Sequence, residues 1–91
     1  MDPTTDRARR IARRESLTAR EREIMQFVAA GLSNEEIGAV AGVSSRTVQT
    51  HIASALKKTN TRNRAHLAVF AVRAGIVPLE STAPDRGTRT T

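Results

Sequence analysis

The segment VSSRTVQTHIASALKKT, residues 43–59, contains the side chains best suited to specific hydrogen bonding. An arginine, a glutamine, a threonine, an alanine and a lysine follow one another at spacings of three, one, three and four, as Arg46, Gln49, Thr50, Ala53 and Lys57. On an α-helix these spacings bring the five side chains to one face. In the DNA major groove an arginine can bond a guanine edge, a glutamine can bond an adenine edge, and a threonine methyl can touch thymine. The chemistry that this face offers is therefore the reading of base pairs.

The same segment has an apolar face opposite the polar one. Val48, Ile52 and Leu56 are spaced by four residues, and Ala55 joins them in one stripe. Ser44 stands where a helix cap is expected. The sequence thus predicts a helix over about residues 45–59, with its aliphatic side in a core and its polar side outward.

The distribution of charge supports a polyanionic partner. Residues 15–42 contain two arginines and five glutamates, whereas residues 43–73 contain six lysines and arginines and no acid. Lys57 and Lys58 can reach phosphates beside the polar face, where the short Ala53 allows close approach. The net charge of +6 therefore favours one surface directed at nucleic acid, with a merely solvated surface as the alternative.

Local signals place three further helices around this one. Thr18-Ala-Arg-Glu21 and Ser33-Asn-Glu-Glu36 are capping boxes, and their helices should end at Gly31 and Gly42. Asn63 or Thr61 caps a last helix that ends at Gly75. We expect the first helix to bury Ile24, Phe27 and Val28, and the second to bury Ile37, Val40 and Ala41.

A glycine is placed where the second and third helices should cross. Gly38 in a helix interior costs about 1 kcal/mol relative to alanine, and close packing would justify that cost. The short helix, the turn at Gly42 and the capped helix that follows together make a helix-turn-helix. The predicted fold is all-α, a four-helix bundle that contains this motif.

The last helix has two apolar stripes. Leu67, Ala71 and Ala74 form one, and the other consists of Ala65, Val69, Val72 and Ile76. One stripe can seal the core, and the other needs a cover. Either the first helix covers both stripes, or a second subunit covers one of them, and we expect a homodimer through Val69, Val72, Arg73 and Ile76.

The two ends of the chain differ in composition from its middle. Residues 1–16 contain five arginines and one large aliphatic residue after Met1, and we expect a flexible basic arm that is transiently helical around Ala8–Arg14. This arm either contacts DNA or acts as a solubilising linker. Residues 78–91 are expected to be a disordered tail, which leaves residues 17–77 as the domain.

Several classes of protein are disfavoured. Without cysteine the chain can form no disulfide or thiolate metal site, and no apolar run is long enough to cross a bilayer. His51 and His66 have no third ligand near them, so we expect neither a metal nor a cofactor. The capping boxes account for Glu21 and Glu36, and no base is placed to activate a serine. We therefore expect a cytoplasmic protein that is not an enzyme.

The order of these motifs resembles the DNA-binding domain of LuxR-type (GerE-like) transcription regulators over about residues 17–77. The shared pieces are Leu17-Thr18 with Arg20-Glu21, Gly31 with Ser33-Asn34-Glu35-Glu36-Ile37, Val43-Ser44 with Thr47-Val48 and His51, and Lys58, Asn63-Arg64 and Ala74-Gly75. The resemblance implies a bacterial protein, associated with the nucleoid, whose fourth helix pairs two subunits on an inverted repeat of double-stranded DNA.

The resemblance also implies roles for single residues. Base contacts fall on Arg46, Gln49, Thr50 and Ala53. Phosphate contacts fall on Ser45, Lys57, Lys58 and the helix starts near Thr18 and Asn34.

The sequence departs from the pattern of this family in two ways. Gln49 stands where a lysine is common, and Ala41, Ala55, Thr59 and Thr61 replace larger apolar residues. A thin core would favour subunit pairing or packing of the arm.

The rival function is a protein-interaction module that binds another regulator or an RNA polymerase subunit. Since only about 16 residues precede the motif, we expect either a stand-alone regulator or part of a larger one.

Overall fold

The computed structural model describes residues 3–76, and this part of the chain is all-helical without strands. The helices are α1 (Pro3–Glu15), α2 (Ala19–Ala29), α3 (Asn34–Ala41), α4 (Ser45–Thr59) and α5 (Arg64–Arg73). The predicted all-α class is confirmed, with one helix more than expected. The tail predicted over residues 78–91 lies outside the described residues.

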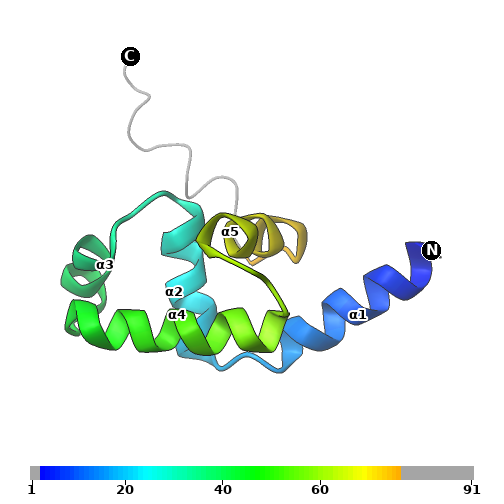
Figure 1. Ribbon diagram of the computed structural model, residues 1–91, viewed down its shortest axis with the longest axis horizontal. Coiled ribbons are helices and arrows are strands. Elements are labelled where there is room, and N and C mark those ends of the chain that lie inside the picture. Colours follow the sequence, from blue (N-terminus) through cyan, green and yellow to red (C-terminus); the bar gives the residue numbers. More distant parts are fainter. Residues whose placement is uncertain (1–2, 77–91) are drawn as a thin grey trace, which may run out of the picture.

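Helix α4 runs along one side of the domain. In Figure 1, α3 lies at its N-terminal end and α1 lies beyond its C-terminal end. Helix α2 packs against both α4 and α5, and α3 packs against α4. The helix-turn-helix of α3 and α4 is thus supported from behind by α2 and α5.

The predicted helix starts are confirmed by their hydrogen bonds. The Glu21 amide donates to Thr18 Oγ1 over 3.0 Å, and the Thr18 amide donates to Glu21 Oε1 over 2.8 Å. Ser33 and Glu36 make the same reciprocal pair. Of the two candidates for the last helix, Asn63 is the cap, because its Oδ1 accepts from the amide of His66 over 2.8 Å.

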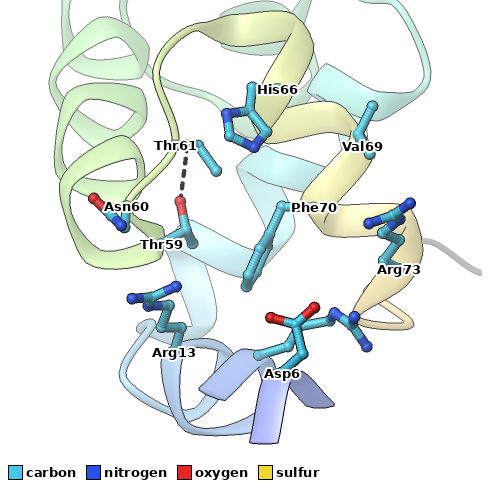
Figure 2. Close-up of a pocket in the computed structure, with 10 residues that line it drawn as sticks. Asp6, Arg13, Thr59, Asn60, Thr61, His66, Val69, Phe70 and Arg73 are labelled. Carbon is cyan, nitrogen blue, oxygen red and sulfur yellow. Dashed lines mark hydrogen bonds between the residues drawn. The ribbon is translucent and has the colours of Figure 1, made fainter. Parts of the chain in front are cut away.

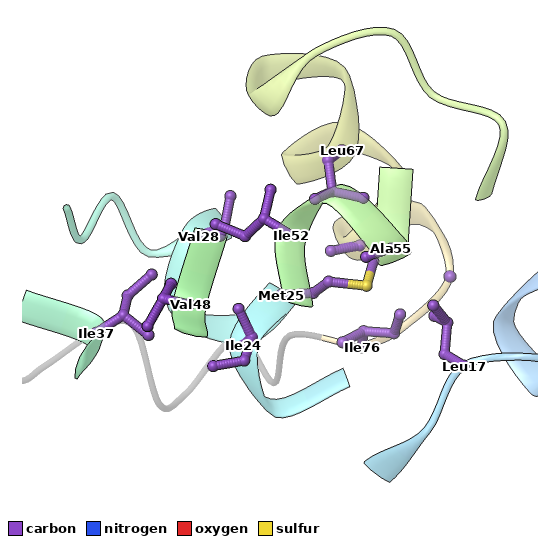
Figure 3. Packing of buried hydrophobic residues seen from close by; sticks show 12 residues of the cluster. Leu17, Ile24, Met25, Val28, Ile37, Val48, Ile52, Ala55, Leu67 and Ile76 are labelled. Atoms are coloured by element: carbon purple, nitrogen blue, oxygen red, sulfur yellow. The ribbon is translucent and has the colours of Figure 1, made fainter. Parts of the chain in front are cut away.

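Aliphatic side chains from four helices form the core (Figure 3). The predicted stripe of α4 is buried at Val48, Ile52 and Ala55. The buried apolar residues are Leu17, Ile24, Met25, Val28, Ile37, Val48, Ile52, Ala55, Leu67, Ala71, Ala74 and Ile76. The prediction that Val40 is buried was wrong, since its side chain is 63% exposed. Ile37, Gly38 and Ala41 define the packed side of α3, and Val40 points away from it.

Hydrogen bonds compensate for one polar residue in this core. Thr59, which stands where a larger apolar residue was expected, is only 2% exposed. Its hydroxyl donates to the Ala55 carbonyl over 2.7 Å and shares a 2.9 Å hydrogen bond with Thr61 Oγ1. The buried hydroxyl is therefore satisfied, which avoids the penalty of an unpaired polar group.

Within the expected basic arm of residues 1–16, helix α1 extends well beyond the stretch Ala8–Arg14 that was expected to be transiently helical. None of its side chains from Thr5 to Glu15 is buried, so apolar burial could not have revealed it. Its charges instead match the helix dipole, with Asp6 in the first turn and Arg13 and Arg14 in the last. Arg14 Nη1 also donates to the Ala74 carbonyl over 3.1 Å and so links α1 to the C-terminal end of α5.

Gly38 allows α3 and the start of α4 to approach closely, as the sequence predicted. A Cβ atom at this position would stand 2.5 Å from the carbonyl oxygen of Val43, which is a backbone atom. Gly42, which ends α3, instead needs its left-handed φ of 76° and has open space around it. The two glycines are thus required for different reasons, contact at one and conformation at the other.

Replacing Gly38 with alanine should destabilise the domain. The overpacked Cβ meets a backbone atom and should cost about 1–3 kcal/mol, and the gain of roughly 1 kcal/mol in helix propensity should recover only part of that cost. Urea unfolding followed by circular dichroism measures the difference. Gly42→Asn is the matched control, since asparagine tolerates the left-handed region and should lose less. A Gly38→Ala variant more stable than wild type would contradict the close approach.

Candidate nucleic-acid interface

The polar face of α4 points away from the fold. Arg46, Gln49, Thr50, Ala53 and Lys57 are all exposed, while the apolar stripe on the opposite side is buried. The predicted orientation of the helix is therefore confirmed, whereas the assignment of base contacts to these residues stays a prediction. Thr50 Oγ1 donates to the Arg46 carbonyl over 3.2 Å, which occupies the hydroxyl and leaves the methyl group for other contacts.

A buried carboxylate fixes α4 against α2. Glu21 is 5% exposed, and its Oε2 accepts from Ser54 Oγ over 2.6 Å. Its Oε1 accepts from Lys58 Nζ over 2.9 Å and from the Thr18 amide over 2.8 Å. Ser54 and Lys58 lie four residues apart, so one acid binds two successive turns of α4. Sequence reasoning assigned Glu21 to the capping box alone and did not identify Ser54.

The pKa of Glu21 reflects these bonds. Burial by itself raises the pKa, but hydrogen bonds from Ser54, Thr18 and Lys58 and the positive charge of Lys58 outweigh burial and lower it from 4.5 to about 2. The carboxylate is therefore ionised throughout the neutral range. Its charge is matched by Lys58, so the rear of α4 carries no unpaired acid at this point.

Of the residues predicted to contact phosphate, some are exposed and have no side-chain partner within the described residues, and others already bind elsewhere in the fold. Ser45 and Lys57 are exposed at opposite ends of α4. Lys58 is half-buried and its ammonium group is bound to Glu21, so its first role is structural. Thr18 is exposed, but its hydroxyl oxygen already accepts from the amide of Glu21.

Arg64 links the starts of α3 and α5. Its Nη1 donates to Asn34 Oδ1 over 2.7 Å, and its Nη2 donates to the Leu32 carbonyl over 2.6 Å. Asn34, predicted to contact phosphate, therefore has its side-chain oxygen occupied and its amide nitrogen available. No local pattern signals a pair 30 residues apart, although Arg64 was among the residues that carried the family resemblance.

The residues predicted to pair two subunits do not share one surface. Val69 and Val72 are 51% and 52% exposed, and Arg73 is also exposed. Ile76 is only 6% exposed and belongs to the core, which corrects its assignment to the interface. Its amide donates to the Ala71 carbonyl over 2.9 Å, and its carbonyl accepts from Gln26 Nε2 over 2.7 Å, so the chain folds back after Gly75.

The described part of the chain contains neither a cluster of potential metal ligands nor a helix that could span a membrane. No three histidine, aspartate or glutamate side chains there come together in a group that could hold a metal ion. No helix within the same residues has the length and hydrophobicity needed to cross a membrane.

Comparison with known proteins places the chain among regulators. Residues 15–71 match the GerE family, described as bacterial regulatory proteins, luxR family. The chain is similar to the uncharacterized transcriptional regulatory protein YxjL and the transcriptional regulatory protein LiaR of Bacillus subtilis (strain 168), with 46% and 43% identity over 63 residues. It is 33% identical over 63 residues to the response regulator protein VraR of Staphylococcus aureus (strain COL).

These alignments cover 69% of the chain but only 29–30% of each relative. The chain thus spans less than a third of the length of the curated relatives it matches. No solved structure matches it significantly.

The network around Glu21 predicts a specific dependence of stability on pH. Because its folded pKa of about 2 lies below the ordinary 4.5, its contribution is fully present above pH 4.5 and is lost as the pH falls toward 2. At about 1.4 kcal/mol per pKa unit, that contribution is at most about 3.5 kcal/mol. The difference in free energy of unfolding between wild type and Glu21→Gln should therefore shrink from pH 5 to pH 2.

Urea titrations at several pH values provide this measurement. Glu35→Gln is the control, because Glu35 is exposed and its substitution should leave the pH profile unchanged. A wild-type advantage over Glu21→Gln that is constant between pH 5 and pH 2 would contradict the role assigned to the buried charge.

Proposed function

The chain belongs to the luxR family of bacterial regulatory proteins, and on that premise we propose that it is a sequence-specific DNA-binding transcription regulator. The observation that carries the proposal is the outer face of α4, which is exposed and polar and contains no acid. The luxR family is one of regulatory proteins rather than enzymes, which agrees with the expectation from the sequence.

In the proposed complex α4 enters the major groove. The groove is about 12 Å wide and admits one helix. Arg46 and Gln49 carry the bidentate donors and acceptors for guanine and adenine edges, and the methyl groups of Thr50 and Ala53 offer apolar contact to thymine. None of these side chains is buried by the fold, so the face can meet the bases without rearrangement.

Phosphate contacts flank this face in the proposed complex. Lys57 is exposed and makes no ion pair within the described residues, which makes it a better phosphate ligand than Lys58. Ser45 lies in the first turn of α4, where helix amides favour an anion. Thr18 and Asn34 stand at the starts of α2 and α3 and contribute the remaining donors.

In the proposed complex, two subunits pair with each other through α5 and together bind an inverted repeat. Val69 and Val72 form an exposed apolar groove with Ala29 and Ala68, and Arg73 borders it. A two-fold axis through this groove would bury the two valines of each subunit and match a palindromic site. With this function, the protein would act on the nucleoid in the bacterial cytoplasm.

The same groove supports a second candidate function. An exposed apolar surface on a helical module could bind another regulator or an RNA polymerase subunit rather than a second copy. In that case the polar face of α4 would make no contact to bases. The two candidates differ in whether the chain binds duplex DNA by itself.

Substitutions on α4 test the proposed reading of bases. Arg46→Ala and Gln49→Ala should each cost about 1–3 kcal/mol at particular base pairs and relax the preference there. Lys57→Ala should instead weaken binding to all sequences and reduce the magnitude of the salt slope by about 1. Selection of bound duplexes, followed by titrations at several salt concentrations, measures both effects. Failure of every selected duplex to bind at low salt would favour the protein-interaction candidate.

The proposed pairing through α5 is tested separately. Val69→Ser with Val72→Ser should abolish cooperative occupation of an inverted repeat while binding to a half-site is unchanged, because the apolar contact area is lost. Gel-shift titrations on a duplex with the inverted repeat and on a duplex with one half-site separate the loss of cooperativity from a loss of DNA binding. Val40→Ser is the matched control, since Val40 is an exposed valine that lies on α3 and not on α5. Cooperativity that survives the α5 substitutions would rule out this interface.

A further inference from the structure

A charged cavity lies where α1 meets the domain. It has a volume of about 230 Å³ and is bordered by α1, the C-terminal end of α4 and α5. We call this space the anion cavity. The residues that line it include Asp6, Arg10, Arg13, His66, Phe70 and Arg73. In the view of Figure 2, Arg13 and Arg73 stand on opposite sides of this space, with Phe70 and Asp6 between them.

The lining of the anion cavity has more positive than negative charge. Three guanidinium groups face one carboxylate, and none of the four makes an ion pair within the described residues. Arg10 and Arg13 are half-buried, so the surrounding protein screens them less than bulk water would. The local excess of two positive charges matches a dianion, and the planar guanidinium fork matches the oxygens of a phosphate.

The remaining walls add two features that favour an organic phosphate. The side chains of Val69 and Phe70 give the cavity an apolar side. His66 Nδ1 accepts from the amide of Arg62 over 3.2 Å, so in the neutral ring the other nitrogen carries the proton and can donate to a phosphate oxygen.

The position of α1 gives this site a consequence. Helix α1 buries none of its side chains from Thr5 to Glu15, and Ile11 is 49% exposed. Arg10 and Arg13 of α1 line the same cavity as Arg73 of α5, so like charges oppose the docking of α1 on α5. A bound anion would turn this repulsion into attraction from both sides.

We propose that the anion cavity binds a phosphate group and that this phosphate fastens α1 to the domain. The phosphate belongs either to a small phosphate ester, whose apolar part rests on Phe70, or to the backbone of bound DNA. The site is separate from the face of α4 that is proposed to read bases, so each can fail without the other.

Titration of the full chain with inorganic phosphate and with AMP, followed by NMR at constant ionic strength, tests the site. Saturable shifts are expected at α1, at residues 59–61 and at residues 66–73. Arg10→Gln with Arg13→Gln should weaken binding by roughly tenfold or more, because charge-assisted hydrogen bonds are lost. Arg9→Gln is the matched control, since Arg9 is exposed on the same helix and does not line the cavity.

A third variant should act in the opposite direction. Asp6→Asn removes the one carboxylate from the lining and should tighten binding by about two- to fivefold. This gain cannot arise from loss of structure. Circular dichroism with and without phosphate should show more helix in the bound state of the wild type.

Binding to DNA identifies the source of the phosphate. If the Arg10–Arg13 double variant binds duplex as tightly as Arg9→Gln does, the ligand is a small ester. If it loses further duplex affinity and salt slope, the phosphate is that of DNA, and both outcomes support the site. Equal phosphate binding by the double variant, Arg9→Gln and Asp6→Asn, or no saturable binding to the wild type, would overturn the proposal.

Discussion

The buried carboxylate of Glu21 is the constraint on which the orientation of α4 depends. An ionised group that is 5% exposed must be satisfied by nearby donors, and Ser54 and Lys58 on α4 supply two of them. If α4 rotated or slid, the buried charge would lose these partners, and a buried charge left without them is strongly destabilising. The aliphatic stripe of α4 would tolerate small displacements at lower cost, because hydrophobic contact is not directional. The polar network therefore defines the register, and the core supplies most of the stabilisation.

Two further contacts complete the support of α4. The backbone of α3 at Gly38 meets the turn before α4 so closely that no side chain fits between them. Arg64 then binds the start of α3 to the start of α5 through Asn34 and the Leu32 carbonyl. With its rear held in these ways, α4 leaves Arg46 and Gln49 exposed without partners in the described part of the chain. The helix backbone that carries the face proposed to read bases is thus held in place before DNA arrives, which lowers the entropic cost of binding.

Local patterns predicted most of the fold. Caps such as Thr18, Ser33 and Ser44 are encoded within four residues, and the two-sided character of α4 is encoded within that one helix. Contacts across 30 or more residues were not predictable in this way, as the bonds of Glu21 to Lys58 and of Arg64 to Asn34 show.

Val40 and Ile76 were misplaced because their burial depends on packing and on the turn after Gly75. Helix α1 was predicted only as a transient helix around Ala8–Arg14, because its charges, and not apolar burial, match it to its environment. Within the candidate site, sequence predicted which residues are exposed, but only the structure separated Lys57 from Lys58.

The central claim is that the outer face of α4 meets the bases while its rear stays fixed. NMR spectra of the labelled chain, recorded before and after addition of a bound duplex, test this most directly. The largest shifts are expected at Arg46, Gln49, Thr50 and Ala53, and the signals of Glu21 and Ser54 should move little. Shifts confined to α5 or α1, with an unchanged α4, would contradict the account.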